Sequence, residues 1–428
     1  MKKGFRRALC FLLVAMLLSI MAMPAYAATT GKNGLFSYTM RGNGTLTITK
    51  FDWSGYQKNT DIVIPQMIDG YTVTAIGDLA FSQGDVDVEK VKLPDRKYEA
   101  KDAVLIIPNT VTTVGEKAFF NSGIGRVNIP ASVNSIGAAA FCTGCLKNVT
   151  VQPGNEKYAA IEGALYDKKA KELLAFALDA TAVPEGIVSL GEFSCMNFEP
   201  KDAHNLFPST LKEIKNFSMW SSYLRSPAAN FYTTGALSGT IYPEIEIIGE
   251  YAFARATISG EYWFSNVTKI GSGSFYGTRI HKAIYLYKLK KIPERAFAYA
   301  SGYDGKVQFS KAEKIGKEAF MGSDMGNDLG YCEPQIIEDR AFKGATYAAV
   351  DSKYLSKIEY IGEEAFQAER YYLEMTIPAS CTFIGDNAFY KKVKLKVTPG
   401  SYAEIWAQEN GYEYDNGIEQ DLSWLGQN

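Results

Sequence analysis

Histidine is almost absent from this chain, and so are the short motifs on which many enzyme classes depend. Its 428 residues include only two histidines, His204 and His281, which stand far apart in the sequence. There is no H-E-x-x-H pair for zinc, no G-x-S-x-G turn for a serine nucleophile, and no G-x-x-x-x-G-K-[ST] loop for a phosphate. The sequence therefore predicts no catalytic residue, no metal site and no cofactor, and we expect a protein that is not an enzyme.

Cysteine is scarce as well, with six in the whole chain, of which Cys10 belongs to an N-terminal apolar segment. The other five are Cys142, Cys145, Cys195, Cys332 and Cys381. An odd and scattered set of this kind is not the framework of a disulfide-rich fold. The C-x-x-C pair at 142 and 145 could be a redox pair, but a zinc site would need a second such pair. We interpret it as part of a repeat loop.

An excess of positive charge is also missing. Lysine and arginine total 45 against 47 aspartate and glutamate residues, which gives a formal net charge of -2 at pH 7. Binding to a nucleic-acid backbone depends on a basic patch or stripe. A nucleic-acid partner is therefore not expected.

Long apolar runs are confined to one place, the N-terminus. Residues 1–27 open with four basic side chains, continue with ALCFLLVAMLLSIMAM, and end in Ala25-Tyr26-Ala27, a small-x-small pattern for cleavage. This pattern predicts a removable secretory signal peptide. A retained anchor is the alternative, because the run approaches membrane-spanning length. Without the leader, 45 − 4 = 41 basic residues face 47 acidic ones, so the mature charge is −6. No later run predicts a retained membrane span.

Aromatic residues, in contrast, are abundant, with 27 Tyr and 24 Phe, and many of them belong to one recurring phrase. The phrase is an aliphatic residue, glycine, two polar residues, a small residue and an aromatic, as in IGDNAF at 384–389. From Ile248 onward its openers lie 22 to 24 residues apart, a period typical of leucine-rich-repeat solenoids. The clear openers are Ile76, Val114, Ile136, Leu190, Ile248, Ile270, Ile292, Ile315, Ile337, Ile361 and Ile384.

A second phrase, apolar-x-x-apolar-x-apolar, occupies the rest of each unit. Examples are VEKVKLP at 88–94 and IGRVNIP at 124–130, where the last positions alternate between apolar and polar. Alternation of this kind predicts a strand with one buried face. In the second example Arg126 and Asn128 would point outward and the aliphatic residues beside them inward.

The first phrase is expected to be a packing device. In IGDNAF, Gly385 would permit a tight backbone and Ala388 would leave room for the neighbouring coil. Each coil of a solenoid buries its apolar side only against its neighbours, so the phrase must recur. The phenylalanines predicted to stack as an internal column are Phe119, Phe141, Phe253, Phe275, Phe297, Phe320, Phe342, Phe366 and Phe389.

Two units, IPASVNSIGAAAF at 129–141 and IPASCTFIGDNAF at 377–389, resemble BspA-type leucine-rich repeats of bacterial surface proteins. The resemblance covers roughly residues 60 to 400. It implies a mainly β repeat solenoid, a leucine-rich-repeat coil of short strands and turns. The segment FSYTMRGNGTLTITKFD (36–52) resembles the β-hairpin cap that opens such proteins. The segment TPGSYAEIWAQENGYEY (398–414) resembles their closing cap, which contains a short helix.

The expected organisation has two departures from regular repeats. One long interval contains a stretch that reads as a hairpin inserted beside the coil. A later stretch with Trp220, Tyr223 and Tyr232 is either a set of degenerate coils or an excursion. The expected boundaries are 1–27 for the signal peptide, 28–71 for the N-terminal β cap, 72–397 for the solenoid with its hairpin insertion at about 152–180 and irregular units at about 190–247, and 398–428 for the C-terminal cap.

With chemistry disfavoured, the outward strand face is the predicted working surface, because solenoids bind extended partners along such faces. The residues predicted to bind a ligand are Arg126, Asn128, Tyr285 and Tyr287, with further aromatics at YWF, 262–264. The acids in the polar slots of the phrase are expected to be solvated. They include Glu250, Asp339, Glu363 and Asp386.

The family resemblance implies adhesion or macromolecular recognition at the bacterial surface by an exported protein. The expected partner is a host, matrix or bacterial surface protein or glycan, and the expected location is secreted or cell-surface. An alternative is a carbohydrate-binding or carbohydrate-degrading protein, because a pair of catalytic carboxylates is not excluded by sequence. A purely structural surface component is a third reading.

Overall fold

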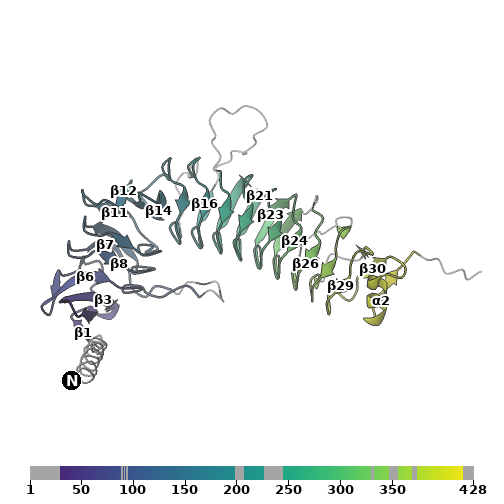
Figure 1. The fold of residues 1–428 in the computed structure, drawn as a ribbon, viewed down its shortest axis with the longest axis horizontal. Helices are drawn as coiled ribbons and strands as arrows, with labels where there is room; N and C mark the ends of the chain where they lie inside the picture. The colour runs from purple at the N-terminus through teal and green to yellow at the C-terminus, as the bar shows by residue number, and fades with distance from the viewer. Residues whose placement is uncertain are drawn as a thin grey trace, which may run out of the picture.

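The computed structural model describes residues 29–87, 90, 92, 95–197, 207–225, 244–328, 332–346, 355–368 and 374–417. The chain forms an elongated, arched rod, with the N-terminal sheet at one end and the helix α2 at the other (Figure 1). The described part is a mainly β solenoid with one short α-helix near its C-terminal end. The predicted fold class is confirmed. The expected signal peptide lies outside the described residues.

Each regular coil contributes one longer strand and one two-residue strand, so parallel ladders run along two faces of the rod. The longer strands form two sheets. The first contains β4 (Ile62–Val63), β7 (Ala100–Ile106), β9 (Ile124–Ile129) and β11 (Asn148–Val151). The second contains β17 (Tyr223–Arg225), β19 (Thr257–Trp263), β21 (Arg279–Leu286), β23 (Ser301–Phe309) and β25 (Asp324–Asp328).

The two-residue strands carry the openers of the phrase, and their sheets follow one another along the opposite face. The first is the N-terminal sheet of β1 (Thr30–Asn33), β2 (Phe36–Arg41), β3 (Thr45–Phe51), β5 (Met67–Ile68), β6 (Tyr71–Ile76), β8 (Thr113–Val114) and β10 (Ser135–Ile136). The second is β12 (Tyr158–Ile161), β13 (Ala164–Asp167), β14 (Glu172–Ala175), β15 (Ser189–Leu190), β16 (Glu213–Ile214), β18 (Ile247–Ile248) and β20 (Lys269–Ile270). The third is β22 (Lys291–Ile292), β24 (Lys314–Ile315), β26 (Ile336–Ile337), β27 (Tyr360–Ile361) and β29 (Phe383–Ile384).

The phenylalanines of the phrase stack inside the rod as predicted. Phe297, Phe320 and Phe342 are fully buried. The Phe320 ring centroid lies 5.3 Å from that of Phe297 and 5.2 Å from that of Phe342, and the ring is nearly parallel to both. The same arrangement continues through Phe366 to Phe389. Rings from successive coils are stacked because the parallel register places identical slots side by side. The column is therefore a direct consequence of the repeat.

The column is interrupted where the phrase degenerates. In LGEFSC and IKNFSM the aromatic slot is taken by Cys195 and Met219, and both side chains are buried. Their aromatic residues stand two positions earlier, where Phe193 and Phe217 stack 4.8 Å apart with an interplanar angle of 4°. The openers still pair as β15, β16 and β18 in one ladder. The described part of 190–247 therefore consists of degenerate coils, while 198–206 and 226–243, including Tyr232, lie outside the described residues.

In the ladder between β4 and β9 the strand position is taken by β7, residues 100–106. The predicted strand at 88–94 lies outside the described residues, apart from Lys90 and Lys92. The 38-residue interval in this unit accommodates an excursion, which reaches far enough along the rod for Arg255 to donate a hydrogen bond to the Lys90 carbonyl at 3.5 Å. Val86 from this excursion packs on a satellite cluster that includes Phe120 and Trp220.

The caps close the apolar ends of the column. At the N-terminal end, β1, β2 and β3 form an antiparallel meander that is continuous with the first short strands. At the other end, α2 (Tyr402–Glu409) is capped by Ser401, whose hydroxyl accepts a hydrogen bond from the Glu404 amide at 3.3 Å. Trp406 of this helix packs edge-on against Phe389 at 5.8 Å. A further sheet of three strands, β28 (Glu374–Ile377), β30 (Lys394–Val397) and β31 (Tyr414–Asp415), lies beside the helix.

The glycine of the phrase has a different role from the expected one. Left-handed backbone is found at the fourth slot of the phrase and not at the glycine, for example at Glu318 (φ 56°) and Asn387 (φ 50°). A Cβ on Gly385 would instead lie 2.5 Å from the Glu363 amide nitrogen of the preceding coil. The glycine is therefore required because two coils approach closely, and the expectation of a tight backbone at Gly385 is corrected.

This correction predicts the effect of an added methyl group. Gly385→Ala should destabilise the protein by about 1–3 kcal/mol, because a buried clash with backbone is not relieved by a side-chain rotation. Gly42→Ala is the matched control, since a Cβ there meets nothing within 4 Å and the backbone is not left-handed. Urea unfolding of both variants measures the difference, and equal midpoints would contradict the close-approach explanation.

Candidate functional site

The outward face of the second long-strand sheet carries an aromatic cluster. In the parallel register, Trp263 of β19 stands beside Tyr285 of β21, and Tyr285 beside Gln308 of β23. The residues before and after Tyr285, Ile284 and Leu286, belong to the inner core cluster and Tyr285 does not, so Tyr285 lies on the outer side of the strand, as predicted. Register and alternation together bring these side chains into one patch. We refer to Trp263, Tyr285, Tyr287 and Gln308 as the strand-face patch.

The rings of the strand-face patch pack on one another. The Trp263 and Tyr285 centroids are 3.8 Å apart with an interplanar angle of 20°. Tyr287 meets the indole edge-on at 5.9 Å, and its hydroxyl donates to Gln308 Oε1 at 3.1 Å. Tyr285 is 8% exposed because the indole covers it, whereas Trp263 and Tyr287 remain partly exposed. Trp263 and Tyr287 therefore form more of the accessible surface than Tyr285.

Two polar atoms beside these rings have no hydrogen-bond partner within the described structure. They are Nε1 of Trp263 and Oε2 of Glu261, two outward positions on β19. A buried polar group left without a partner costs about 1–3 kcal/mol. Both atoms are enclosed by the structure around them, so they add a local cost to the patch and are not contact points for a ligand.

The other two predicted residues form a separate patch. Arg126 and Asn128 lie on β9, in the first long-strand sheet, and are not brought to the aromatic cluster. Arg126 Nη1 donates to the Asp102 carbonyl at 3.2 Å, and Lys147 forms an ion pair with the Asp102 carboxylate at 2.8 Å. Asn128 Oδ1 accepts a hydrogen bond of 2.6 Å from Thr150. These side chains are outward, as predicted, but they are engaged with neighbouring coils.

The five described cysteines form no disulfide, and four of them are buried. Burial raises the pKa of the Cys142 thiol far above its usual range and that of Cys195 to about 12. Cys145, the other member of the C-x-x-C, is less enclosed, and burial again raises its pKa. All three line one small hollow of about 30 Å³. Thiols held protonated are poor nucleophiles, so this arrangement favours a packing role in the repeat loop.

The single described histidine is not part of a catalytic group. His281 Nδ1 lies 3.7 Å from an Asp304 carboxylate oxygen, and both side chains are substantially exposed. His204 lies outside the described residues. Within the described ranges, no group of three or more His, Cys, Asp or Glu side chains could hold a metal ion.

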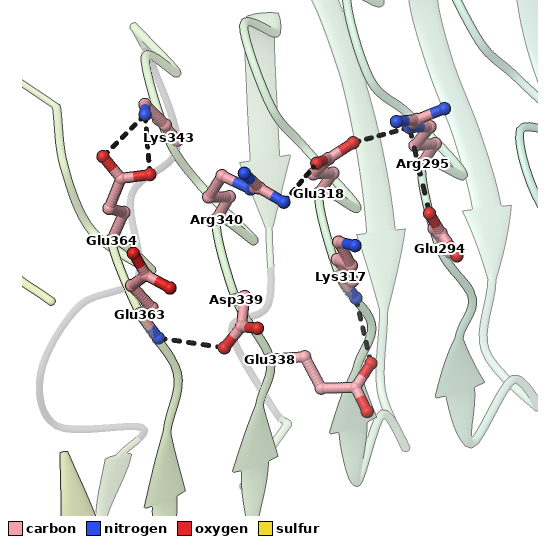
Figure 2. Close-up of polar contacts among 10 residues, drawn as sticks. All are labelled: Glu294, Arg295, Lys317, Glu318, Glu338, Asp339, Arg340, Lys343, Glu363 and Glu364. Carbon is pink, nitrogen blue, oxygen red and sulfur yellow. Dashed lines mark hydrogen bonds and ion pairs between the residues drawn. The ribbon is translucent and has the colours of Figure 1, made fainter. Parts of the chain in front are cut away.

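The polar slots of the phrase connect one coil to the next (Figure 2). Asp339 Oδ1 accepts a hydrogen bond from the Glu363 amide at 3.0 Å, and Asn216 does the same for the Glu250 amide. The carboxylates of Glu363 and Asp386 are exposed, as expected. The next slot along holds buried Glu318 between two arginines of adjacent coils (Figure 2).

Sequence reasoning did not single out Trp263 and Gln308 as partners of Tyr285. The signal was present, because Trp263 and Tyr285 are one repeat apart, and so are Tyr285 and Gln308. In a parallel solenoid, outward residues one period apart are neighbours. Two aromatic residues at that spacing predict a stacked pair.

The sequence model of the BspA-type leucine-rich repeat region matches residues 74–166, 177–303, 226–348 and 306–398. A leucine-rich-repeat protein from Eubacterium ventriosum is 14% identical, with 85% of this chain and 95% of that chain covered and a TM-score of 0.40. A leucine-rich cell-surface protein from Faecalibacterium prausnitzii is 18% identical, with 92% and 99% covered and a TM-score of 0.37. A leucine-rich-repeat protein from Bacteroides ovatus is 19% identical, with 91% and 97% covered and a TM-score of 0.34.

No curated protein sequence matches this chain. In the part of the chain that the structure describes, no helix combines the length and the apolar character that crossing a membrane requires.

Proposed function

Because the chain belongs to the BspA-type leucine-rich-repeat family, we propose that it is a non-enzymatic binding protein that recognises a macromolecule through its strand-face patch. The family is one of repeat scaffolds whose fold suits binding and recognition. The observation that carries the proposal is the partly exposed ring cluster of Trp263 and Tyr287 on the outward strand face. Tryptophan and tyrosine are the side chains most enriched at the energetic centres of interfaces.

The proposed biological role is adhesion at the bacterial surface by an exported protein. The partner would be a host, matrix or bacterial surface protein or glycan with an apolar group to cover the exposed parts of the Trp263 and Tyr287 rings. The Arg126 and Asn128 patch would at most extend the contact, since both residues already bond to adjacent coils. The outward ladder of β19, β21 and β23 supplies a continuous platform for such a partner.

The binding test uses the mature protein on an array of matrix proteins, bacterial surface proteins and glycans. The double variant Trp263→Ala, Tyr287→Ala should bind the captured ligand with about thirtyfold lower affinity, the loss expected when a hot spot of about 2 kcal/mol is removed. Tyr299→Ala is the matched control, because this tyrosine is 47% exposed but belongs to the turn side of the coil. Its affinity should be unchanged.

Several results would count against this proposal. Equal affinity in the double variant and the wild type would remove the strand-face patch from the recognition surface. Turnover of a polysaccharide by the purified protein would replace the binding reading with the enzyme alternative. The absence of any saturable ligand would favour a structural component.

The export part of the proposal has its own test. Secreted material should begin at Ala28, because the pattern Ala25-Tyr26-Ala27 precedes it and signal peptidases cleave after small residues at these positions. Mass spectrometry of the N-terminal peptide from culture supernatant measures the cleavage point. An intact N-terminus on surface-exposed protein would indicate a retained anchor.

A further inference from the structure

A second surface feature lies on the opposite face of the rod, along β24, β26, β27 and β29. The first residue of each two-residue strand points outward, and in chain order these are Lys314, Ile336, Tyr360 and Phe383. Beside them run the third slots of the phrase, Lys317, Asp339, Glu363 and Asp386. The first row therefore begins with a lysine and ends with two aromatic rings toward the C-terminus. The second row begins with a lysine and continues with three carboxylates.

These two rows line two adjoining hollows of about 490 Å³ each. Asp339 and Tyr360 belong to both, so the hollows form one groove that crosses successive coils. Its C-terminal end is closed by α2 through Tyr402, Trp406 and Asn410. We refer to this continuous depression, from Lys314 to α2, as the turn-face groove.

An unusual apolar surface forms part of the groove. Tyr360 and Phe383 stack with centroids 4.7 Å apart and an interplanar angle of 7°. The strand β29 is the last in its ladder, so no further coil covers the second face of Phe383, and this side chain is 43% exposed. That ring lines the hollow in front of α2. An exposed aromatic face inside a groove is a place for a ligand group to pack.

The charge around the groove selects the kind of ligand. Lys314 is neutralised by Glu338 at 2.5 Å. The other charged residues of the lining are four acids, Asp339, Glu359, Glu363 and Asp386, and one cation, Lys317. Within the described ranges, none of these four carboxylates forms an ion pair with a lysine or arginine. A cation placed on an aromatic face and next to carboxylates gains from both contacts, whereas a neutral ligand leaves this charge uncompensated.

We propose that the turn-face groove binds an extended basic peptide segment of a partner protein. A lysine or arginine side chain lies over the free face of Phe383, with its charge beside Glu363 and Asp386, and the next basic residue is received by Asp339 and Glu359. The groove runs across coils that are about 4.8 Å apart, and its carboxylates come from successive coils, so an extended chain laid along it passes several of them. This site is independent of the strand-face patch on the other side of the rod.

The probe is an acetylated and amidated octapeptide of alternating lysine and glycine, titrated into the mature protein by calorimetry at low salt. Phe383→Ala, or Glu363→Gln together with Asp386→Asn, should weaken binding about tenfold, because each removes either the ring or the charge that holds the cation. Matched controls are Ile247→Ala and Glu250→Gln, which occupy the same two slots of an earlier coil, outside the groove. They should bind as the wild type does.

Specificity and location are tested together. The affinity should fall steeply as salt is raised, and the same peptide with acetylated lysines should not bind. Trp263→Ala, in the strand-face patch, should leave peptide binding intact, so this inference and the proposed strand-face function can fail separately. The inference is overturned if the lysine peptide does not bind, if the control variants lose binding equally, or if a neutral glycan occupies the groove in preference.

Discussion

Replacing Phe320 with alanine is expected to lower the free energy of unfolding by about 3–5 kcal/mol, the cost of deleting a buried aromatic side chain. The ring is fully buried and is stacked between Phe297 and Phe342, and Phe309 meets it edge-on at 6.1 Å. The cavity would open at the junction of three coils, where the surrounding column cannot close without shifting whole coils.

Chemical denaturation measures the size of this loss, and hydrogen exchange shows where it acts. In a solenoid each coil contacts mainly its neighbours, so protection should fall first between about residues 300 and 345. Phe383→Ala is the matched control, since that ring is 43% exposed, and its stability change should be below about 1 kcal/mol. A uniform loss of protection along the chain would contradict nearest-neighbour stabilisation.

The second large effect is expected where a carboxylate is buried between two arginines. The Glu318 side chain is 5% exposed, and its oxygens lie 2.5 Å from Arg295 Nε and 3.0 Å from Arg340 Nη2. The carboxylate in turn raises the pKa of the Arg295 guanidinium. The double variant Arg295→Met, Arg340→Met should lose about 3–5 kcal/mol, because it leaves a buried charge without a partner.

Two comparisons separate this charge effect from lost packing. The triple variant that also carries Glu318→Met should recover most of the loss, since an apolar replacement of a whole buried ion group is often close to neutral. Lys343→Met removes the cation of a pair whose Glu364 side chain is more exposed, at 23%, and should cost less than about 1 kcal/mol. Thermal unfolding of the double variant, the triple variant and Lys343→Met measures these differences in stability. A double variant no less stable than Lys343→Met would mean that water or another group solvates Glu318.

The coil and its interior could be predicted because they depend on a local pattern that repeats. An opener, a small residue and an aromatic at constant spacing are sufficient to stack Phe297, Phe320 and Phe342 once the chain closes into parallel coils. Where the repeat pattern is less regular, individual coils were harder to predict from the sequence. Cys195 and Met219 occupy the aromatic slot, so their coils were hard to recognise, although their openers still pair in the ladder.

The strand-face residues could be predicted in direction but not in grouping. Alternation assigned Asn128 and Tyr285 to the outer surface correctly. Whether outward residues meet depends on which sheet their strands join, and β9 and β21 belong to different sheets. Exposure likewise depends on the neighbouring coil, because the indole of Trp263 covers most of Tyr285.

By itself, the sequence determined that this chain is a solenoid, which residues point inward, and that no familiar catalytic motif is present. These properties follow from residue type and period, which operate over one coil at a time. Only the tertiary structure decided why Gly385 is required, how Glu318 is paired, and that a groove with a free ring at Phe383 ends at α2. Each of these is a contact between coils or between the last coil and its cap, so its geometry is created by side chains one repeat or more away along the chain.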